Sequence, residues 1–380
     1  MKRIGFIGYG LRSETMMKAF RTLEADITVA AIADPRWEEI APGLQADPYF
    51  VDTHYYSDAD EMLEKESLDG VFIGTRCSLH TQYACKVLKM DLPLFLEKPV
   101  SITRAQYEML REAAAGKEHR CVVSFPLRLS SIVLEMKKIV DSGALGKLTM
   151  VQAINNVPYG SVYYHSWYRD PKETGGLFLQ KTTHDIDYIN FLTGERPVSV
   201  CAKTTKLHFK GEHPAGLHCP DCPEYRTCSE SSYVVKNVLK EDVQGDCCCF
   251  AVDTGNEDGA SAIFTTESGI LISYNQNFTV KKNAGRRGCR LIGTKGSAEF
   301  DFYTAEIRHD DYLEPQTINH KFTFPPGAHF GGDERLALDF MGVLNGEPAQ
   351  SHLGAGLASA AACLAAKQAD AEGRFVPIVY

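Results

Sequence analysis

The sequence predicts an α/β protein with two domains: an N-terminal doubly wound parallel sheet, followed by an α/β domain with a large, mostly antiparallel, open sheet. Three observations support this prediction. The chain has 380 residues and 44% apolar content, enough for two separate cores. Its first third alternates short apolar strands with helical segments. After Pro126, alternating strands rich in Thr, Val, Phe and Tyr follow one another at short intervals.

The first domain, placed at residues 1–125, should contain buried strands separated by helices. We expect strands at 3–7, 28–33, 70–74, 92–96 and 121–125, and helices at 13–23, 79–89 and 103–115. Strands that alternate with helices require right-handed crossovers, and such crossovers produce a parallel sheet.

The second domain, placed at residues 126–380, should pack helices on one face of its sheet. We expect helices at 131–142 and 353–372, and strands at 148–154, 198–206, 260–266, 269–277, 289–293 and 298–302. A cysteine-rich insertion interrupts this pattern at about 210–250. Because an open sheet face in a soluble protein needs a partner, we expect a homodimer or homotetramer formed through this sheet.

Charge and hydropathy exclude several classes of protein. The net charge is -9, the pI is about 5.8, and Lys and Arg are scattered, so neither nucleic acid nor an anionic membrane is an expected partner. The apolar runs are shorter than the ~20 residues that cross a bilayer. Residues 1–3 lead into a strand rather than into the apolar segment of an export signal, so we expect a cytoplasmic protein.

A glycine-rich turn, Gly8-Tyr9-Gly10-Leu11-Arg12-Ser13, links the first strand to the first helix. It matches the dinucleotide fingerprint of a Rossmann domain in its first two glycines, which allow the turn and the close approach of a pyrophosphate. Ser13 occupies the place of the third glycine, where a small residue serves helix packing. The alternative is a plain tight turn.

Asp34 ends the second expected strand, where a carboxylate binds the ribose hydroxyls of NAD. The alternative is a turn residue before Pro35. Arg36 lies two residues on and can contact a 2′-phosphate, so NADP also stays open.

The segment Glu97-Lys98-Pro99 follows the apolar run 92–96. The carboxyl edge of a parallel sheet is where α/β proteins bind ligands, so Lys98 should lie beside the nicotinamide. A surface lysine would explain neither this place nor the following proline, which stiffens the turn.

The motifs taken together resemble the Gfo/Idh/MocA family, that is, glucose-fructose oxidoreductase, inositol dehydrogenase and the rhizopine-catabolism proteins. The resemblance runs over nearly the whole chain and rests on the glycine turn, Asp34, Thr75 with His80, residues 97–99, Arg128, residues 175–187 and residues 329–333. It implies a Rossmann domain followed by a larger oligomer-forming domain, and oxidation or reduction of a hydroxyl on a sugar or cyclitol. The cofactor contacts that we expect are Gly8, Tyr9, Gly10, Leu11, Arg12, Asp34, Arg36, Thr75, Arg76, His80, Glu97 and Lys98.

The resemblance also implies that Lys98 contacts both substrate and cofactor and that His184 shuttles a proton. Oxidation of an alcohol requires removal of the hydroxyl proton, and a histidine that titrates near neutral pH suits this work. A nearby lysine stabilises the developing alkoxide. The alternative for His184 is a helix residue bonded to backbone.

Gln180 departs from the family pattern, which commonly has an aspartate four residues before the histidine. Gln180 can hydrogen-bond a substrate but cannot accept a proton. Lys181 follows it and is a third candidate catalytic residue, because a neighbouring lysine would depress its pKa. Alternatively, Lys181 forms a salt bridge with Asp185 or Asp187.

Residues suited to a sugar precede and follow this helix. Aromatic rings stack on the apolar faces of sugars, and polar groups bond their hydroxyls, although an aromatic loop can also serve only packing. Arg128 and Arg169 can hold a carboxylate or phosphate, and Asp333 can bond sugar hydroxyls or cap a helix. The expected substrate contacts are Lys98, Arg128, Tyr163, His165, Trp167, Arg169, Gln180, His184 and Asp333.

Six of the twelve cysteines lie between residues 219 and 249. Cys219, Cys222 and Cys228, with Cys247 or a neighbouring cysteine, have the composition of a structural zinc site. Free thiols, disulfides or an iron-sulfur cluster are the alternatives.

The sequence therefore predicts an NAD(P)-dependent oxidoreductase that acts on a sugar, sugar derivative or cyclitol. Two rival functions stay open. One is an NAD-dependent glycoside-cleaving enzyme that oxidises its substrate transiently. The other is a dinucleotide-binding sensor without catalysis, which the missing aspartate would permit.

Overall fold

The computed structural model describes residues 1–324 and 328–380. Contacts divide the chain into two compact units: unit 1 is Met1–Leu134 with Phe324–Ala360, and unit 2 is Glu135–Thr323 with Ala361–Tyr380. The sequence suggested a single change of domain at 125/126. The segment Phe324–Ala360 instead groups with the N-terminal unit.

Unit 1 is built on a six-stranded sheet in which every pair of neighbouring strands is parallel. The strand order is β3-β2-β1-β4-β5-β6, in which the order reverses between β1 and β4. The strands are β1 (Lys2–Ile7), β2 (Ile27–Ala33), β3 (His54–Tyr56), β4 (Gly70–Ile73), β5 (Leu94–Leu96) and β6 (Cys121–Val123). The central strands are buried on both faces, which explains their continuous apolar runs.

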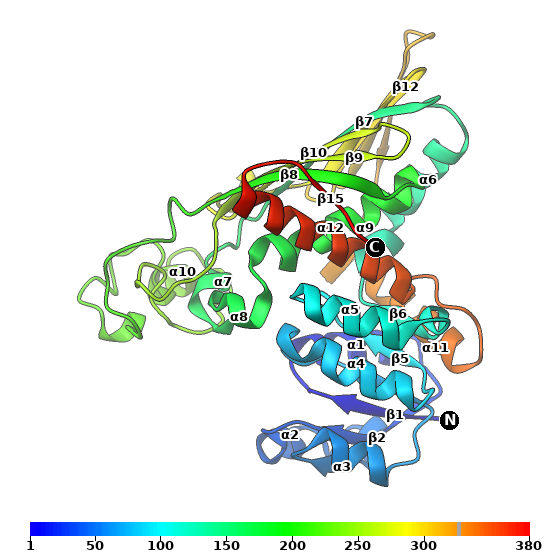
Figure 1. Cartoon of the computed structure of the whole chain (residues 1–380). Coiled ribbons are helices and arrows are strands. Elements are labelled where there is room, and N and C mark those ends of the chain that lie inside the picture. The colour runs from blue at the N-terminus through cyan, green and yellow to red at the C-terminus, as the bar shows by residue number, and fades with distance from the viewer. Residues whose placement is uncertain (325–327) are drawn as a thin grey trace. The chain divides into compact units, whose positions relative to one another are not determined.

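Helices cover both faces of this sheet (Figure 1). They are α1 (Leu11–Thr22), α2 (Trp37–Leu44), α3 (Ala59–Lys65), α4 (His80–Lys89), α5 (Arg104–Ala114) and α11 (Gly332–Leu344). Phe72 and Phe95 stack with ring centroids 4.5 Å apart and share one core with α1 and α11. Phe340 of α11 completes this core, 5.7 Å from the Phe95 ring. Because side chains alternate along a strand, α4 and α5 pack on the opposite face.

Unit 2 contains a nine-stranded sheet with the order β14-β13-β12-β11-β7-β10-β9-β8-β15. Only β7 and β10 pair in parallel among these strands. The strands are β7 (Leu148–Asn156), β8 (Pro197–Thr205), β9 (Gly259–Thr266), β10 (Leu271–Asn277), β11 (Arg286–Gly293), β12 (Gly296–Asp301), β13 (Glu306–Asp311), β14 (Thr317–Lys321) and β15 (Val376–Pro377). The predicted combination of a doubly wound parallel sheet and a mostly antiparallel sheet is confirmed.

The long helix α9 (Leu177–Thr193) lies along one face of the second sheet (Figure 1). Its Tyr188 ring contacts Phe300 edge-on at 5.7 Å, and Thr182 donates to Gln276 at 2.9 Å. The remaining helices are α6 (Ser131–Asp141), α7 (Val162–His165), α8 (Pro171–Thr174), α10 (Ser232–Asn237) and α12 (Leu353–Glu372), of which α6 and α12 each contribute to both units. Within residues 1–324 and 328–380, no helix has the length and apolar character that crossing a membrane requires.

Candidate active site

The glycine turn joins β1 to α1 and packs closely against the backbone that follows β4. Gly8 has a φ of +80°, and a Cβ there would lie 3.0 Å from the backbone of Gly74. Ser13 fits the third position of the motif, because its Oγ donates to the carbonyl of Gly8 at 3.0 Å. Gly10 is the N-cap of α1, and no side chain caps this end. The first amides of α1 are thus suited to a pyrophosphate.

Asp34 follows β2 and is held in one orientation. Its Oδ2 accepts from the amide of Tyr9 at 2.9 Å, and its Oδ1 accepts from the amide of Arg36 at 2.9 Å. The carboxylate is buried, whereas the Arg36 side chain is 60% exposed and pairs with it at 3.3 Å. The Asp34 carboxylate is therefore held in a fixed orientation, as NAD binding requires of a group that accepts hydrogen bonds from the ribose hydroxyls.

Lys98 is half-buried directly after β5 and precedes a cis peptide bond to Pro99. Two side chains at the start of α4 fix this turn: His80 Nδ1 lies 2.8 Å from the carbonyl of Pro99, and Thr81 donates to Val100 at 2.9 Å. The other nitrogen of His80 lies 3.2 Å from the carbonyl of Thr75. Burial lowers the pKa of His80, although the two carbonyl contacts act in the opposite direction. His80, which we expected to contact the cofactor, is therefore placed to position the lysine turn.

Arg12 connects the glycine turn to two other predicted site segments. Its Nε donates to Glu97 at 2.7 Å, its Nη2 donates to Ser124 at 3.0 Å, and the same Nη2 lies 2.6 Å from Asp333. Although burial opposes a charge here, the neighbouring Glu97 and Asp333 raise the pKa of Arg12. The Oδ2 atom of Asp333 also lies within hydrogen-bond distance, 3.0 Å, of His329 Nδ1. Both Arg12 and Asp333 thus have structural partners inside unit 1, and their expected ligand contacts stay predictions.

The remaining expected residues of unit 1 have the following places. Thr75 and Arg76 follow β4 at the ligand-binding edge of the sheet, and Arg76 is exposed. Leu11 begins α1 with its side chain 64% exposed. Arg128 is buried after β6, and its guanidinium lies 3.4 Å from the carbonyl of Gln350.

In unit 2, α9 carries Gln180, Lys181 and His184, all of them buried. Gln180 and His184 are four residues apart and therefore lie on one face of the helix. The helix begins at a glycine pair, and Glu257 accepts from the amide of Phe178 at 2.5 Å, which satisfies its N-terminus. Neither alternative salt bridge of Lys181 occurs, since no ion pair joins it to a carboxylate among the described residues.

Asp185, also on α9, is the centre of a buried polar network. Its Oδ1 accepts from Arg287 Nε at 2.8 Å, and its Oδ2 accepts from Asn155 and Tyr274, each at 2.8 Å. Sequence reasoning did not single out Arg287, because a single arginine in a strand usually faces solvent. This network fixes α9, and with it His184, on the sheet.

The aromatic segment before α9 folds into short helices. Tyr163 is buried and contacts Tyr168 and Phe278 edge-on at 5.3 and 5.5 Å, while Trp167 stacks on Tyr168 at 3.9 Å. Lys181 lies over the ring of Tyr163, 4.6 Å from its centroid. The rings of this segment pack against one another, and Tyr163, together with Tyr159 at the start of the segment, lies next to Lys181 of α9.

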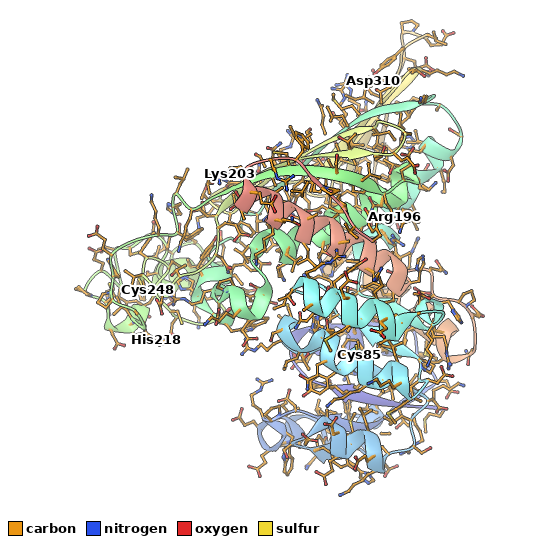
Figure 2. All side chains as sticks on the ribbon, in the orientation of Figure 1. Cys85, Arg196, Lys203, His218, Cys248 and Asp310 are labelled. Carbon is orange, nitrogen blue, oxygen red and sulfur yellow. The ribbon has the colours of Figure 1, made fainter. Side chains whose placement is uncertain are left out.

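His165 and Arg169 lie against the cysteine-rich insertion, where Figure 2 shows His218 and Cys248. His165 Nδ1 lies 2.7 Å from the carbonyl of Cys247, and its Nε2 lies 3.5 Å from Cys249 Sγ. Arg169 donates to Asp253 at 2.7 Å and to Thr254 at 2.8 Å. These contacts give both residues a structural function, and their expected substrate contacts stay predictions.

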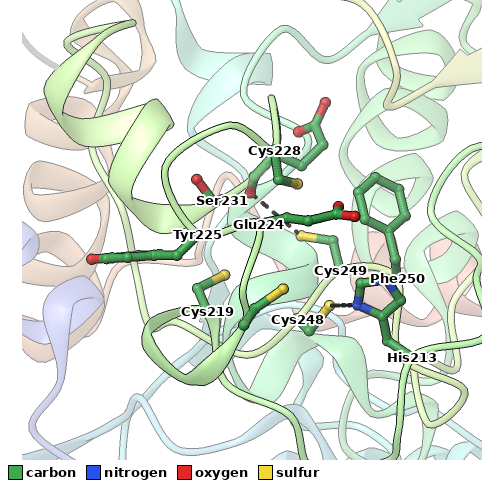
Figure 3. A pocket seen from close by; sticks show the side chains of 11 residues that line it. His213, Cys219, Glu224, Tyr225, Cys228, Ser231, Cys248, Cys249 and Phe250 are labelled. Atoms are coloured by element: carbon green, nitrogen blue, oxygen red, sulfur yellow. Dashed lines mark hydrogen bonds between the residues drawn. The ribbon is translucent and has the colours of Figure 1, made fainter.

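The zinc expectation is not supported. The twelve cysteines, all within the described part of the chain, are free thiols, and no group of three or more His, Cys, Asp or Glu among the described residues is arranged to hold a metal ion. Figure 3 shows a small pocket on which the thiols converge, lined by Cys219, Cys222, Cys228, Cys248 and Cys249. Cys247 is not part of this lining. Burial raises the pKa of the thiols of Cys219, Cys228, Cys248 and Cys249.

Comparison with known proteins is consistent with these features. YteT of Bacillus subtilis (strain 168), an oxidoreductase by name, is 27% identical over 392 aligned residues that cover 90% of this chain and 89% of its own. Inositol 2-dehydrogenase of Rhizobium meliloti (strain 1021) is 25% identical over 62% of this chain and 68% of its own.

Solved structures share the fold at low sequence identity. A levoglucosan dehydrogenase in complex with NADH and levoglucosan superposes with a TM-score of 0.79 at 16% identity, covering 100% of both chains. The oxidoreductase domain protein of Kribbella flavida gives a TM-score of 0.80 at 18% identity, again covering 100% of both.

Two family models match most of the chain. The model described as "Oxidoreductase family, NAD-binding Rossmann fold" matches residues 2–125, and the "GFO/IDH/MocA C-terminal domain" matches residues 133–299. The chain therefore belongs to the Gfo/Idh/MocA family of NAD-binding oxidoreductases.

Proposed function

We propose that the protein is an NAD-dependent dehydrogenase that transfers hydride between nicotinamide and a CH–OH or keto group of a sugar, sugar derivative or cyclitol. One observation carries the proposal: the glycine turn, Asp34 and Lys98 all follow parallel strands on either side of the β1/β4 reversal in unit 1. Ligands of open α/β sheets bind at this edge. The buried carboxylate of Asp34 favours NAD over NADP, whose 2′-phosphate it would repel.

In this proposal each of the site residues has its own function in binding or proton transfer. Bound NAD supplies the hydride acceptor. The amides at the start of α1 and the Asp34 carboxylate orient the dinucleotide. Lys98 donates to the reacting hydroxyl and stabilises the charge that develops on its oxygen. His184 accepts the hydroxyl proton, a role that an imidazole performs near neutral pH.

Gln180 stands where the family pattern commonly has an aspartate, and its amide cannot accept the proton from His184. Gln180 is 4% exposed, and its amide is suited to orient a substrate hydroxyl from the same face of α9 as His184.

We further propose that the chain acts as a homo-oligomer through the open face of the second sheet. This face has a shallow hollow whose lining includes Arg286, Arg290, Glu299, Glu306 and Arg308. Mixed charges of this kind favour a self-complementary contact, because each copy offers both signs to the other. Sedimentation at increasing salt tests this contact, which should weaken as the charges are screened.

The dehydrogenase proposal is tested by following NADH absorbance with a panel of monosaccharides, uronic acids and inositols. Lys98→Met and His184→Asn should each lower kcat/KM by about 10²-fold or more. The exposed residues Lys89 and His119 provide matched controls, Lys89→Met and His119→Asn, which should leave the rate unchanged. If both active-site variants turn over at the wild-type rate while NADH binding persists, the proposal is refuted.

A further inference from the structure

Lys181 is a buried lysine enclosed by aromatic rings. It is 7% exposed, and its Nζ lies 3.4 Å from the hydroxyl of Tyr159. The same atom lies 5.1 Å from the ring centroid of Tyr159 and 4.6 Å from that of Tyr163. Ring faces attract a cation but do not neutralise it.

The charges around Lys181 do not balance when it is protonated. Asp185, the carboxylate four residues further along α9, is fully buried and is already held by Arg287 at 2.8 Å. Arg287 is 8% exposed, so two cationic side chains lie near one buried anion, which only Arg287 contacts among the two. A buried excess charge is costly, and one additional negative charge would compensate it.

The proton on Lys181 is accordingly held weakly. Burial, and then the charge of Arg287, lower the pKa of Lys181 to about 7, although Asp185 acts in the opposite direction. An anion that binds beside this amine would favour its protonated form and draw a proton from solvent.

The position of Lys181 suits contact with a substrate. It precedes His184 by three residues on α9, so both lie toward the same side of the helix. Among the neighbours Tyr159, Tyr163, Asp185 and Arg287, only Tyr159 is exposed, at 39%. A ligand would therefore approach Lys181 past the Tyr159 ring.

We propose that Lys181 binds the carboxylate of a uronic acid, which makes acidic sugars the substrate class of this protein. The inference rests on the proposed function, since it assigns a substrate to the same site. A carboxylate supplies the single negative charge that the pair of cations and Asp185 require, whereas a phosphate dianion would leave an excess of negative charge. The tyrosine rings match the apolar C–H face of a pyranose.

The test is calorimetric titration of the NAD-loaded full-length protein at pH 8. D-Glucuronate and D-galacturonate are compared with D-glucose, D-galactose and D-glucose 6-phosphate, in two buffers that differ in ionisation enthalpy. We expect a hexuronate to bind at least tenfold more tightly than its neutral counterpart. Its binding should take up about one proton, because the free amine is mostly neutral at this pH.

The variants separate a binding function from a structural one. Lys181→Met should lose both the preference for uronates and the proton uptake. Lys181→Arg should retain binding without proton uptake, because an arginine stays charged, and it tests the same group even if the methionine variant fails to fold. Lys172→Met, a change at an exposed lysine in α8, should behave as wild type.

Three results would overturn the inference: hexuronates that bind no better than neutral sugars, a preference that survives in Lys181→Met, or tighter binding of the sugar phosphate. A different result would refute the proposed dehydrogenase function while leaving this inference intact. In that case uronate binding persists with its proton uptake, but no compound in the panel yields NADH.

Discussion

Arg12 Nε donates to Glu97 over 2.7 Å, which joins the glycine turn to the segment that carries Lys98. The two residues lie after different strands, β1 and β5, with β4 between them. The same guanidinium lies 2.6 Å from Asp333, at the start of α11. One partly buried cation thereby holds three segments of unit 1 in a common arrangement.

Replacing Arg12 should strongly destabilise unit 1. Arg12→Met leaves the buried carboxylates of Glu97 and Asp333 without their common partner, a loss of about 3–5 kcal/mol in the free energy of unfolding. Arg12→Lys keeps the charge, but the lysine amine lacks the planar guanidinium that contacts both carboxylates. This variant should therefore recover only part of the lost free energy of unfolding. Urea unfolding measures both values. Equal stability of wild type and Arg12→Met would contradict the structural function of Arg12.

The free energy of unfolding should depend on pH through the ionisation of Asp333. Burial would raise the pKa of this carboxyl, but the bond to His329 and the charge of Arg12 lower it from 3.8 to about 2. The stabilisation that results is fully present above about pH 4, and it is lost as the pH falls through about 2. Its size is about 2 kcal/mol, from the difference in pKa.

Asp333→Asn is the matched variant for this prediction. The difference in unfolding free energy between wild type and Asp333→Asn should shrink as the pH is lowered from 5 to 2.5, since protonation makes the two side chains alike. A difference that stays constant over this range would assign the low pKa to another carboxyl.

Asp34 should determine the choice between NAD and NADP. Asp34→Ser removes the acceptor for the ribose hydroxyls, and NAD should bind at least tenfold more weakly, consistent with the loss of about 1.5–3 kcal/mol for a charged hydrogen bond. NADP should gain affinity, because the repelling charge is gone and Arg36 is released from its 3.3 Å pair. Fluorescence titration of both reduced cofactors measures the ratio. In the Asp34→Ser/Arg36→Ala variant the gain for NADP should disappear, and a gain that persists would exclude Arg36 as its source.

The sequence predicted five of the six parallel strands, because burial on both faces leaves continuous apolar runs, as in β4 and β5. The edge strand β3 was missed, since its three residues carry no apolar run. The C-terminal helix was predicted with the bounds of α12, Leu353–Glu372. Strands β13 and β14 were missed, since polar and charged residues dominate them and backbone pairing at the sheet edge, rather than an apolar period, holds them in place.

In the candidate site, too, the sequence predicted residues that lie in local motifs but not the contacts between residues far apart in the chain. The glycine turn, Asp34 and Lys98 each follow a strand, so the local sequence around each of them was enough to predict it. The contacts of Arg12 with Asp333 and of Asp185 with Arg287 join residues far apart in the chain. No local pattern encodes such pairs, and only the folded sheet brings them together.

His165 provides a test between a structural and a substrate-binding function. It is 1% exposed and bonded to the carbonyl of Cys247, and burial lowers its pKa. His165→Ala should therefore leave the KM for sugar within about twofold while it loosens the insertion, because the cavity and the lost bond cost about 2–4 kcal/mol locally. Limited proteolysis should cut residues 210–250 faster in this variant than in His218→Ala, where the ring is half exposed and pairs with the exposed Asp246. If KM instead rises tenfold or more while proteolysis is unchanged, His165 contacts the substrate and the structural assignment fails.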